Sequence, residues 1–353
     1  MSKLIGTGTC SGKIKLSQDD IKNFIYQLFS SYPDIDTMIN VFNNSEITQR
    51  YISVPVGWFG TKHTFSERNK IYREEALSLS INAIKDCLNN SGMNPGDIDC
   101  IIFVSSTGIS TPTIDAMIFN ELKLNNHIKR IPLWGLGCAG GAAGVSRAME
   151  YVKANRKHNC LLVAAELCSL TFQKDDLSKS NIVASSLFSD GCAAAIIAGK
   201  ESEYYNKKGI ELLYSLSTIY NDSLDIMGWD IVDDGFRVLF SRDIPSIVRK
   251  YVKTNIMELL NQSELVLEDI KYLVTHPGGM KVINAYEESL KLEPGALKYS
   301  RQVLSGHGNM SAPSVLYVLK EFFENNEFQK DNYGILSSLG PGFSSELVLF
   351  KAS

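Results

Sequence analysis

Three side chains in short, glycine-rich motifs of this 353-residue sequence could together carry out acyl transfer. Cys138 lies in GCAGG, between an apolar run and a small-residue stretch that we expect to begin a helix. His276 lies in THPGG, at the end of a predicted strand, and Asn309 lies in GHGNMS. A cysteine, a histidine and a side-chain amide can supply a nucleophile, a base or ion-pair partner, and an oxyanion donor. Because a helix N-terminus favours an anion, we expect the Cys138 thiol to be more acidic than a free thiol.

The glycine loop around Cys138 also matches a different kind of site. WGLGCAGG (134–141) has the G-x-G-x-x-G spacing of a dinucleotide-binding turn, and Glu166, which closes a later apolar run, could be the acid that binds the ribose. The motif lies well inside the chain, however, and its small residues continue to Gly144. That continuation predicts a helix buried on all sides. We therefore interpret the loop as one that presents a nucleophile.

Other cysteines and histidines compete for these roles. The six remaining cysteines have no C-x-x-C or zinc-ligand spacing, so we interpret them as reduced core thiols and expect no metal site. His307 lies close to Asn309, but its glycine-flanked loop offers it no fixed partner. We expect His63, His127 and His158 to be solvated, because they lie in polar segments.

Apolar runs that alternate with helical patterns predict an α/β fold whose sheet is covered by helices on both faces. A histidine at the end of such a strand would lie in the crevice to which α/β sheets deliver side chains. We expect the segment 17–75 to form helices and loops that cap this core. The predicted strands are 99–108, 160–169, 192–199, 270–279 and 333–339, and the predicted helices are 74–92, 142–154 and 244–262.

The sequence also contains an internal repeat. Residues 88–99 and 260–271 align without gaps, and each segment leads from a predicted helix end into an apolar strand. With a shift of one residue, the segment around Cys138 aligns with the segment around Asn309. Chance similarity of two helix–turn–strand units is the alternative, but two matches in the same order indicate a duplicated α/β unit. The predicted halves are 1–203, which carries the cysteine, and 204–353, which carries the histidine and the asparagine.

Composition excludes several other classes of protein. The formal net charge is −4 and no basic tract stands out, which argues against a nucleic-acid binder. The N-terminus lacks the apolar stretch of a secretory signal, and no apolar run is long enough to span a membrane. Seven cysteines without disulfide spacing indicate a cytoplasmic protein.

Taken together, GCAGG, HPGG, GNMSA and LGPGFSSE (339–346) resemble the chalcone and stilbene synthase family, the type III polyketide synthases. The similarity extends to SSTGISTP (105–112), ELCSLTF (166–172) and SLFSDGCAAA (186–195), and so covers nearly the whole chain. It implies a thiolase fold, with two duplicated halves in a five-layered αβαβα core, and a homodimer. It also implies malonyl-CoA and acyl-CoA as substrates, with no metal or redox cofactor.

Other proteins of the same implied fold are the alternatives. Ketoacyl-acyl-carrier-protein synthases of the kind that start fatty-acid synthesis use Cys, His and Asn for a single condensation, but their histidine and asparagine motifs differ from HPGG and GNMSA. Hydroxymethylglutaryl-CoA synthases use a glutamate acid that this sequence does not obviously supply. A non-catalytic scaffold would have no need to keep all three residues.

The resemblance assigns further residues to the site. Phe188 matches the family's gatekeeping phenylalanine, where the CoA tunnel meets the cavity. The second gatekeeper aligns near Val238, which departs from the plant pattern, and Phe236 or Phe240 takes its place if the alignment shifts. The other matches are Cys168 and Thr171 in the cavity wall, Thr111 reaching into a partner's cavity, Gly340, Pro341 and Gly342 as backbone scaffold, and Arg50 in the region that contacts the CoA phosphates.

The absence of a second aromatic ring at Val238 indicates the class of starter. A wider apolar passage admits a long aliphatic chain, whose burial contributes about 0.8 kcal/mol per CH2 group. We therefore expect a fatty acyl-CoA starter and alkylpyrone or alkylresorcinol products.

Overall fold

Nine strands form one continuous sheet in the computed structural model, which describes residues 1–353. The strand order is β11-β12-β13-β8-β1-β7-β6-β4-β5, so only β8 separates the first strand of the chain from the last. The bounds are β1 (Ser2–Ser11), β4 (Cys100–Ser105), β5 (Lys129–Trp134), β6 (Asn159–Leu167), β7 (Asp190–Gly199), β8 (Ile210–Ile219), β11 (Ile270–Thr275), β12 (Tyr333–Gly340) and β13 (Ser344–Ala352).

The two ends of this sheet repeat one another. β4 is parallel to β6, and the order then continues antiparallel through β7 to β1. In the same way, β11 is parallel to β12, which is followed antiparallel by β13 and β8. The halves join where Ser2, Lys3 and Leu4 of β1 pair antiparallel with β8. The topology therefore confirms the predicted duplication, and residue 203 lies in the segment between β7 and β8.

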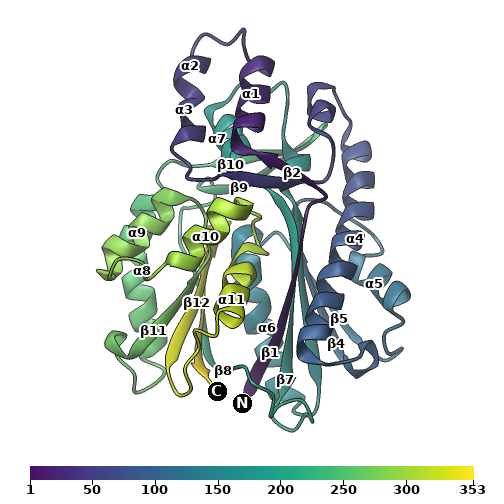
Figure 1. Ribbon diagram of the computed structural model, residues 1–353, viewed down its shortest axis with the longest axis vertical. Helices are drawn as coiled ribbons and strands as arrows, with labels where there is room; N and C mark the ends of the chain where they lie inside the picture. The colour runs from purple at the N-terminus through teal and green to yellow at the C-terminus, as the bar shows by residue number, and fades with distance from the viewer.

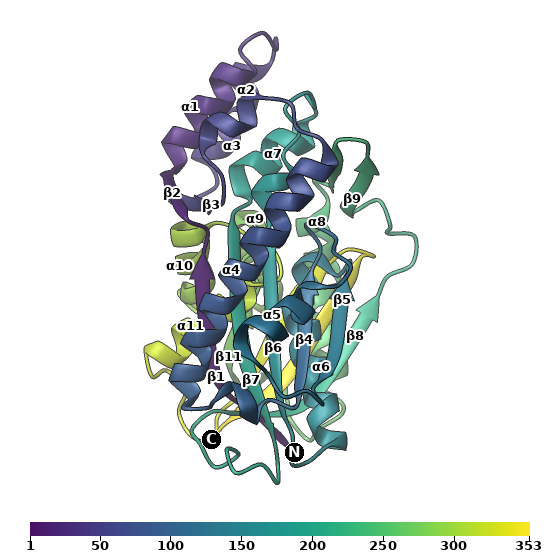
Figure 2. The same ribbon diagram turned by 90° about the vertical axis from the view of Figure 1, so that its right-hand side faces the viewer.

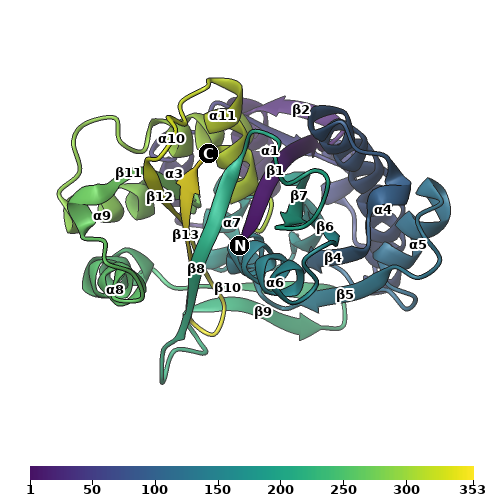
Figure 3. The same ribbon diagram turned by 90° about the horizontal axis from the view of Figure 1, so that it is seen from below.

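Helices divide the molecule into five layers (Figure 3). α6 and α11 lie between the two halves of the sheet, α4 and α5 cover the outer face of one half, and α8 and α9 cover that of the other. The layer order is therefore α-β-α-β-α, as the resemblance implies. The helices are α4 (Phe65–Ser91), α5 (Ile114–Leu122), α6 (Gly140–Ala154), α8 (Ile244–Leu260), α9 (Met280–Leu290), α10 (Lys298–His307) and α11 (Ser314–Glu324).

Side-chain alternation along the strands explains this layering. In β4, Ile102 and Val104 pack into the central core with α6 and α11, whereas Ile101 and Phe103 pack into the core beneath α4. Successive side chains of a strand point to opposite faces of the sheet. A strand covered by helices on both faces therefore needs apolar residues along its whole length, and every residue of β4, β6 and β7 is buried.

Glycines at the start of α6 allow the central elements to approach closely. A Cβ atom on Gly141 would lie 2.3 Å from the carbonyl oxygen of Ala312, just before α11. A Cβ atom on Gly144 would lie 2.5 Å from a methyl group of Leu162 on β6. All residues from Gly140 to Ser146 are buried, which confirms the burial predicted for this small-residue stretch.

A cap of short elements covers one end of the sheet (Figures 1 and 2). Ile21, Ile25, Phe29, Phe42 and Ile182 form an apolar cluster within it. The cap comprises α1 (Gln18–Leu28), α2 (Ile35–Met38), α3 (Asn40–Asn43), α7 (Lys179–Leu187), the ribbon of β2 (Ile14–Ser17) with β3 (Gln49–Ile52), and the ribbon of β9 (Met227–Val232) with β10 (Gly235–Phe240). Short 3-10 turns complete the chain: η1 (Val56–Gly60), η2 (Pro95–Asp97), η3 (Gly137–Ala139), η4 (Cys168–Thr171) and η5 (Leu267–Asp269).

All predicted strands and helices are present, and the segment 17–75 differs in part from its prediction. This segment contains strand β3 as well as helices and loops, and its last residues already belong to α4, which begins at Phe65 rather than near residue 74. A capping box explains the earlier start, because Thr64 accepts from the backbone N–H of Glu67 while the Glu67 carboxylate accepts from that of Thr64. None of the helices is both long and apolar enough to cross a membrane.

Candidate active site

Cys138, His276 and Asn309 line one cavity with an empty volume of about 360 Å³. Cys138 lies in turn η3 after β5, His276 directly follows β11, and Asn309 lies between α10 and α11. Their exposed fractions are 6%, 4% and 1%. The structure thus brings together the three residues selected from the sequence, and it shields them from water.

The internal repeat explains how two of these side chains meet. Cys138 precedes α6 and Asn309 precedes α11, and these two helices hold equivalent central places in the two halves. The end of β11 then supplies His276 from the edge at which parallel strands deliver side chains to a crevice.

Burial controls the protonation of the cysteine. It raises the pKa of the Cys138 thiol to about 11, while hydrogen bonds from the side chains of Ser311 and Asn309 act in the opposite direction. The nearby Glu166 carboxylate also raises this pKa. The expectation that Cys138 is more acidic than a free thiol is therefore wrong, because removal of the sulfur from water outweighs the groups that favour its anion.

His276 is neutral in the same surroundings. Burial lowers the pKa of its imidazole to about 3. Its backbone N–H donates to the carbonyl of Ser337 at 2.9 Å, but neither ring nitrogen has a hydrogen-bond partner. A neutral imidazole with both nitrogens free can accept a proton at one and donate a hydrogen bond from the other. The free nitrogens allow the imidazole to receive the proton of a thiol, but its low pKa makes it a weak base unless the opposite charge forms beside it.

Backbone groups orient the amide of Asn309. Its Oδ1 accepts from the N–H of Ser311 at 2.8 Å, and its Nδ2 donates to the carbonyl of Gly278 at 3.1 Å. An amide NH2 group has two hydrogens to donate, so the second can act on Cys138 and on an oxygen bound in the same cavity. The side chain is therefore set as a donor, which is what stabilisation of an oxyanion needs.

Ser311 belongs to the site although the sequence reasoning did not select it. Its side chain hydrogen-bonds to Cys138, and its backbone N–H binds Asn309. Its φ of 61° lies in the left-handed region, which a residue other than glycine occupies at a cost. Its position two residues after the asparagine in GNMSA was the signal available in the sequence.

The loop of Gly340, Pro341 and Gly342 lies directly behind the cysteine turn. A Cβ atom on Gly340 would lie 2.5 Å from the carbonyl oxygen of Leu136 and 2.7 Å from the backbone nitrogen of Ala139. In the other direction, a Cβ on Gly137 would lie 2.8 Å from the Pro341 ring. The close approach requires glycine at these positions, and it agrees with the backbone scaffold that the resemblance implies.

Aromatic rings gather beside the cysteine cavity. Phe188 lies 6.2 Å from Phe240, edge to face, and 6.2 Å from Trp229. Phe240 also lines the cavity with Cys138. The expectation that the passage lacks a second ring, based on Val238, is therefore corrected: Phe240, two residues further along β10, supplies that ring.

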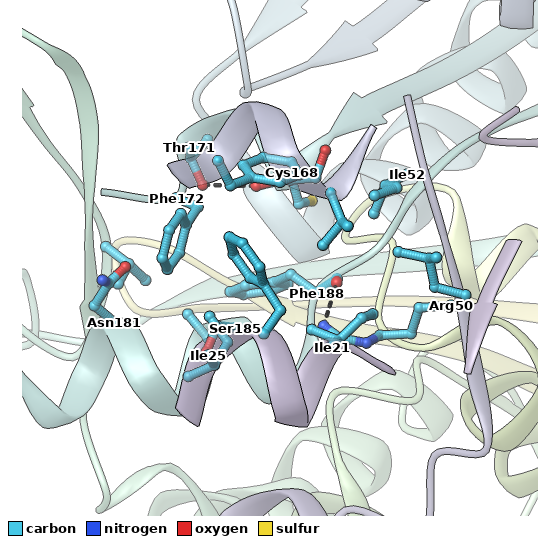
Figure 4. Close-up of a pocket in the computed structure, with 17 residues that line it drawn as sticks. Ile21, Ile25, Arg50, Ile52, Cys168, Thr171, Phe172, Asn181, Ser185 and Phe188 are labelled. Atoms are coloured by element: carbon cyan, nitrogen blue, oxygen red, sulfur yellow. Dashed lines mark hydrogen bonds between the residues drawn. The ribbon is translucent and has the colours of Figure 1, made fainter. Parts of the chain in front are cut away.

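A second, apolar pocket lies next to Phe188 and has an empty volume of about 580 Å³ (Figure 4). Cys168, Thr171 and Val238 all line it, as does Phe188 itself. The substrate-binding residues selected from the sequence thus lie mainly in the wall of this pocket. The other apolar residues of the wall are Leu16, Ile21, Phe24, Ile25, Ile52, Val56, Phe59, Phe172 and Ala184.

Arg50 also lines the apolar pocket, which does not fit its expected contact with CoA phosphates. Only 2% of the residue is exposed, and its Nη1 donates to the carbonyl of Phe188 at 2.9 Å. Burial lowers the pKa of its guanidinium to about 9, and the charge of Asp190 partly opposes this. A phosphate of CoA needs a solvent-facing cation, so Arg50 is removed from that role.

Thr111 lies apart from both cavities. It is exposed, in the loop between β4 and α5, and lines neither the cysteine cavity nor the apolar pocket. This position agrees with a residue that acts on another copy of the chain, and that role stays a prediction.

His307 has fixed partners, contrary to the expectation from its glycine-flanked loop. Its Nδ1 lies 3.2 Å from Oγ of Ser11, and its ring stacks on Tyr51 at a centroid distance of 5.3 Å. It is not among the residues that line the cysteine cavity. The structure therefore favours His276 as the histidine that serves Cys138.

The side chain of Glu166, the acid that a dinucleotide site would need, is fully used in hydrogen bonds to other residues. It is fully buried, and its carboxylate accepts from the N–H and Oγ of Ser106 and from Oγ1 of Thr107. Burial nevertheless raises its pKa to about 7. These contacts leave no role for Glu166 at a ribose, which agrees with the interpretation of the glycine loop as a nucleophile turn.

Comparison with known proteins identifies similar sequences. The family model for "Chalcone and stilbene synthases, N-terminal domain" matches residues 43–201, and the model for the C-terminal domain matches residues 211–353. A Bacillus subtilis (strain 168) protein described as "Putative chalcone synthase" is 42% identical over 99% of both chains. The 1,3,6,8-tetrahydroxynaphthalene synthase of Streptomyces peucetius is 32% identical, over 96% of this chain and 89% of the other.

Solved structures show the same fold. The crystal structure of 1,3,6,8-tetrahydroxynaphthalene synthase from Streptomyces coelicolor, a bacterial type III polyketide synthase, superimposes with a TM-score of 0.94 at 26% identity and covers 99% of both chains. The type III polyketide synthase domain of Steely1 from Dictyostelium gives a TM-score of 0.91 at 26% identity, again over 99% of both chains.

Proposed function

The chain belongs to the chalcone and stilbene synthase family and is a type III polyketide synthase, and from this premise we propose that it extends a fatty acyl-CoA starter with malonyl-CoA. The extended chain closes to an alkylpyrone or alkylresorcinol-type product. The apolar pocket beside Phe188 is the observation that carries the choice of starter.

In the proposed loading step, His276 takes the proton of Cys138. The thiolate attacks the carbonyl carbon of the starter thioester, and CoA leaves as a thiol with the proton that His276 held. Burial disfavours each charge taken singly, as the raised pKa of Cys138 and the lowered pKa of His276 show. The proton is therefore best transferred within the pair, as the sulfur attacks.

In the proposed extension step, malonyl-CoA loses CO2 and becomes an enolate. The second N–H of Asn309 and a ring N–H of His276 stabilise its oxygen. The enolate carbon then attacks the Cys138 thioester, which forms the new carbon–carbon bond and releases the cysteine thiolate. The longer chain, now a CoA thioester, returns to Cys138 for the next round. Loss of CO2 drives each round, so the proposed reaction needs no metal or redox cofactor.

The apolar pocket supports a long aliphatic starter through its lining. Aliphatic and aromatic side chains form most of its wall, and they include Ile21, Phe24 and Ile25 of α1, Ile52 of β3 and Ala184 of α7. Each buried CH2 group of a chain in such a wall contributes about 0.8 kcal/mol. Phe240 restores the aromatic ring that Val238 lacks, so the apolar lining of this pocket, and not a missing gate residue, is what favours the fatty acyl chain.

The proposal also includes a homodimer. β5 is an edge strand of the sheet, and neighbouring apolar side chains are exposed: Ile109 by 46% and Trp134 by 50%. An exposed strand edge presents unpaired N–H and C=O groups that a strand of another chain can pair with. A partner at this edge would lie close to the loop of Thr111.

Incubation of the enzyme with malonyl-CoA and a panel of starters tests the proposal. The panel contains hexanoyl-, dodecanoyl-, hexadecanoyl- and p-coumaroyl-CoA, with products identified by mass spectrometry and Cys138→Ala as the inactive control. We expect multiply extended products from the long chains. Preference for p-coumaroyl-CoA would contradict the fatty acyl starter. A strict need for a malonyl carrier protein, with one condensation only, would indicate a ketoacyl synthase activity, and no product from any starter would indicate a scaffold.

A further inference from the structure

The apolar pocket has a single charged side chain in its wall, the guanidinium of Arg50. Nη1 of this group donates to the carbonyl of Phe188, but Nε and Nη2 are buried and have no hydrogen-bond partner. Figure 4 shows the guanidinium reaching in between Phe188 and Ile21. Two donors of a nearly fully buried cation in the pocket wall therefore lack an acceptor, which is costly unless an occupant supplies one.

The surroundings of Arg50 define what kind of acceptor is missing. Asp190 lies near enough for its charge to act on the guanidinium, yet its oxygens accept from the N–H of Ser53 and from the N–H and Oγ of Ser169. The ring of Phe42 lies 5.9 Å from the guanidinium carbon, and a ring contact of this kind leaves the in-plane N–H donors free. The charge thus has a counter-charge, and what it lacks is a hydrogen-bond acceptor.

A neutral oxygen meets this need better than a carboxylate, because a carboxylate would also face the like charge of Asp190. The proposed reaction makes such oxygens. Each condensation turns the carbonyl that was bonded to Cys138 into a ketone. This ketone lies two carbons away from the carbonyl of the new thioester. Phe188 lines both the apolar pocket and the space beside Cys138, so an elongating chain carries its ketones past Phe188 toward Arg50.

We propose that the free donors of Arg50 bind a ketone oxygen of the elongated chain, so that the apolar pocket prefers oxoacyl chains to plain acyl chains. This inference rests on the proposed function. An extended intermediate is then held more tightly than the starter from which it came. The consequence is a bias toward another round of extension over early release.

The test compares the loading of four thioesters in the absence of malonyl-CoA. Dodecanoyl-CoA and its 3-oxo, 5-oxo and 7-oxo derivatives are mixed with the wild-type enzyme, and CoA release and the mass of the acylated protein give kcat/KM for loading. We expect at least one oxoacyl chain to load about tenfold better than dodecanoyl-CoA, as a hydrogen bond to a charged donor predicts. Because the comparison is made within one protein, it needs no variant.

Variants then assign the preference to Arg50. Arg50→Met removes the donors and should reduce the oxoacyl preference to near unity. Arg50→Lys keeps a charged donor without the planar fork and should retain only part of the preference. Arg68→Met changes a buried arginine that does not line the pocket, and it should keep the preference. Equal loading of all four thioesters by the wild type, or a preference that survives in Arg50→Met, overturns the inference. Failure of every thioester to load overturns the proposed function together with it.

Discussion

Phe188 and Asn309 are joined through their backbones as a parallel bridge. The N–H of Ser189 donates to the carbonyl of Asn309, and the N–H of Asn309 donates to the carbonyl of Leu187, both at 2.9 Å. The bridge ties the aromatic residue beside the apolar pocket, from the first half of the chain, to the amide of the reacting site, from the second half. A shift of Phe188 therefore displaces Asn309. The entry of an acyl chain past Phe188 is thus linked to the position of the oxyanion donor.

Replacement of Asn309 by alanine tests the oxyanion donor. The backbone bridge to Phe188 does not depend on the side chain, so the main loss is the Nδ2 donor. Such a donor is worth about 2.7–4 kcal/mol, or about a hundredfold to a thousandfold in rate. Decarboxylation of malonyl-CoA, followed by CO2 release, should fall by this factor. The melting temperature should fall as well, because the N–H of Ser311 and the carbonyl of Gly278 lose their partner. An unchanged decarboxylation rate would remove Asn309 from the mechanism.

Alkylation of Cys138 by iodoacetamide tests its protonation. The thiolate is the reactive form, and with the pKa at about 11 it is fully present above that pH and is lost as the pH falls. The alkylation rate should therefore rise about tenfold per pH unit from pH 6 to pH 9, as measured by intact mass. Cys138→Ala gives the background from the other cysteines. A rate that is flat between pH 7 and pH 9 would show instead a stable thiolate–imidazolium pair with His276.

Glu166 should make stability depend on pH. Burial raises its pKa from 4.5 to about 7, so the folded state prefers the protonated acid. Its contribution is fully present below pH 4.5 and is lost as the pH rises through 7. The shift corresponds to about 3 kcal/mol. We expect the free energy of unfolding of Glu166→Gln, measured with denaturant, to rise relative to that of the wild type between pH 5 and pH 8. A constant difference between the two proteins would contradict this view of Glu166.

Val238→Phe should shorten the preferred starter. Val238 lines the apolar pocket, and a phenyl ring there would occupy space that the end of a long chain needs. Competition between hexanoyl-CoA and hexadecanoyl-CoA should shift toward hexanoyl-CoA by about tenfold or more, since two buried CH2 groups already account for about 1.6 kcal/mol. Val232→Phe adds a ring to the same ribbon outside the pocket and serves as the control. Equal preferences in the two variants would show that this pocket does not hold the starter.

Gly340→Ala should damage both stability and activity. The added Cβ would lie within 2.7 Å of the backbone atoms of Leu136 and Ala139, which flank the nucleophile turn. Overpacking of this kind typically costs about 1–3 kcal/mol, and here it displaces Cys138 as well. Gly306→Ala, where a Cβ meets nothing within 4 Å, is the matched control and should be tolerated. Full activity of the Gly340 variant, measured by acyl loading, would show that the loop yields without cost.

The reacting residues could be found in the sequence because their types are rare and their positions are local. Cys138 lies before a helix of small residues, His276 lies at a strand end, and the repeat places Asn309 opposite the cysteine. Apolar strands buried on both faces, such as β4 and β6, also stand out as continuous hydrophobic runs. Each of these signals consists of residues that are adjacent in the sequence, so the local sequence pattern is sufficient to detect it.

The rest depends on contacts that no local pattern contains. The high pKa of Cys138 follows from tertiary burial, and the inward turn of Arg50 follows from its bond to Phe188. The ribbon of β9 and β10 did leave a signal, because an Asp-Gly pair between two strand-like runs predicts a hairpin. Asp233 and Asp234 form its turn, and Gly235 begins β10. Recognition of that hairpin would have placed Phe240 near Phe188.

The first strand of the chain, β1, lies in the middle of the sheet, between β7 and β8. Its Ser2 pairs with Leu212 of β8, so the ribosome makes one partner long before the other. At about 5–20 residues per second, the interval is about 10–40 seconds. For most of that time both edges of β1 stay open, because its other neighbour, β7, is made only shortly before β8. Pairing over such a sequence distance makes folding slow. We therefore expect the two halves to fold as one cooperative unit during or after synthesis, with neither half stable when expressed alone.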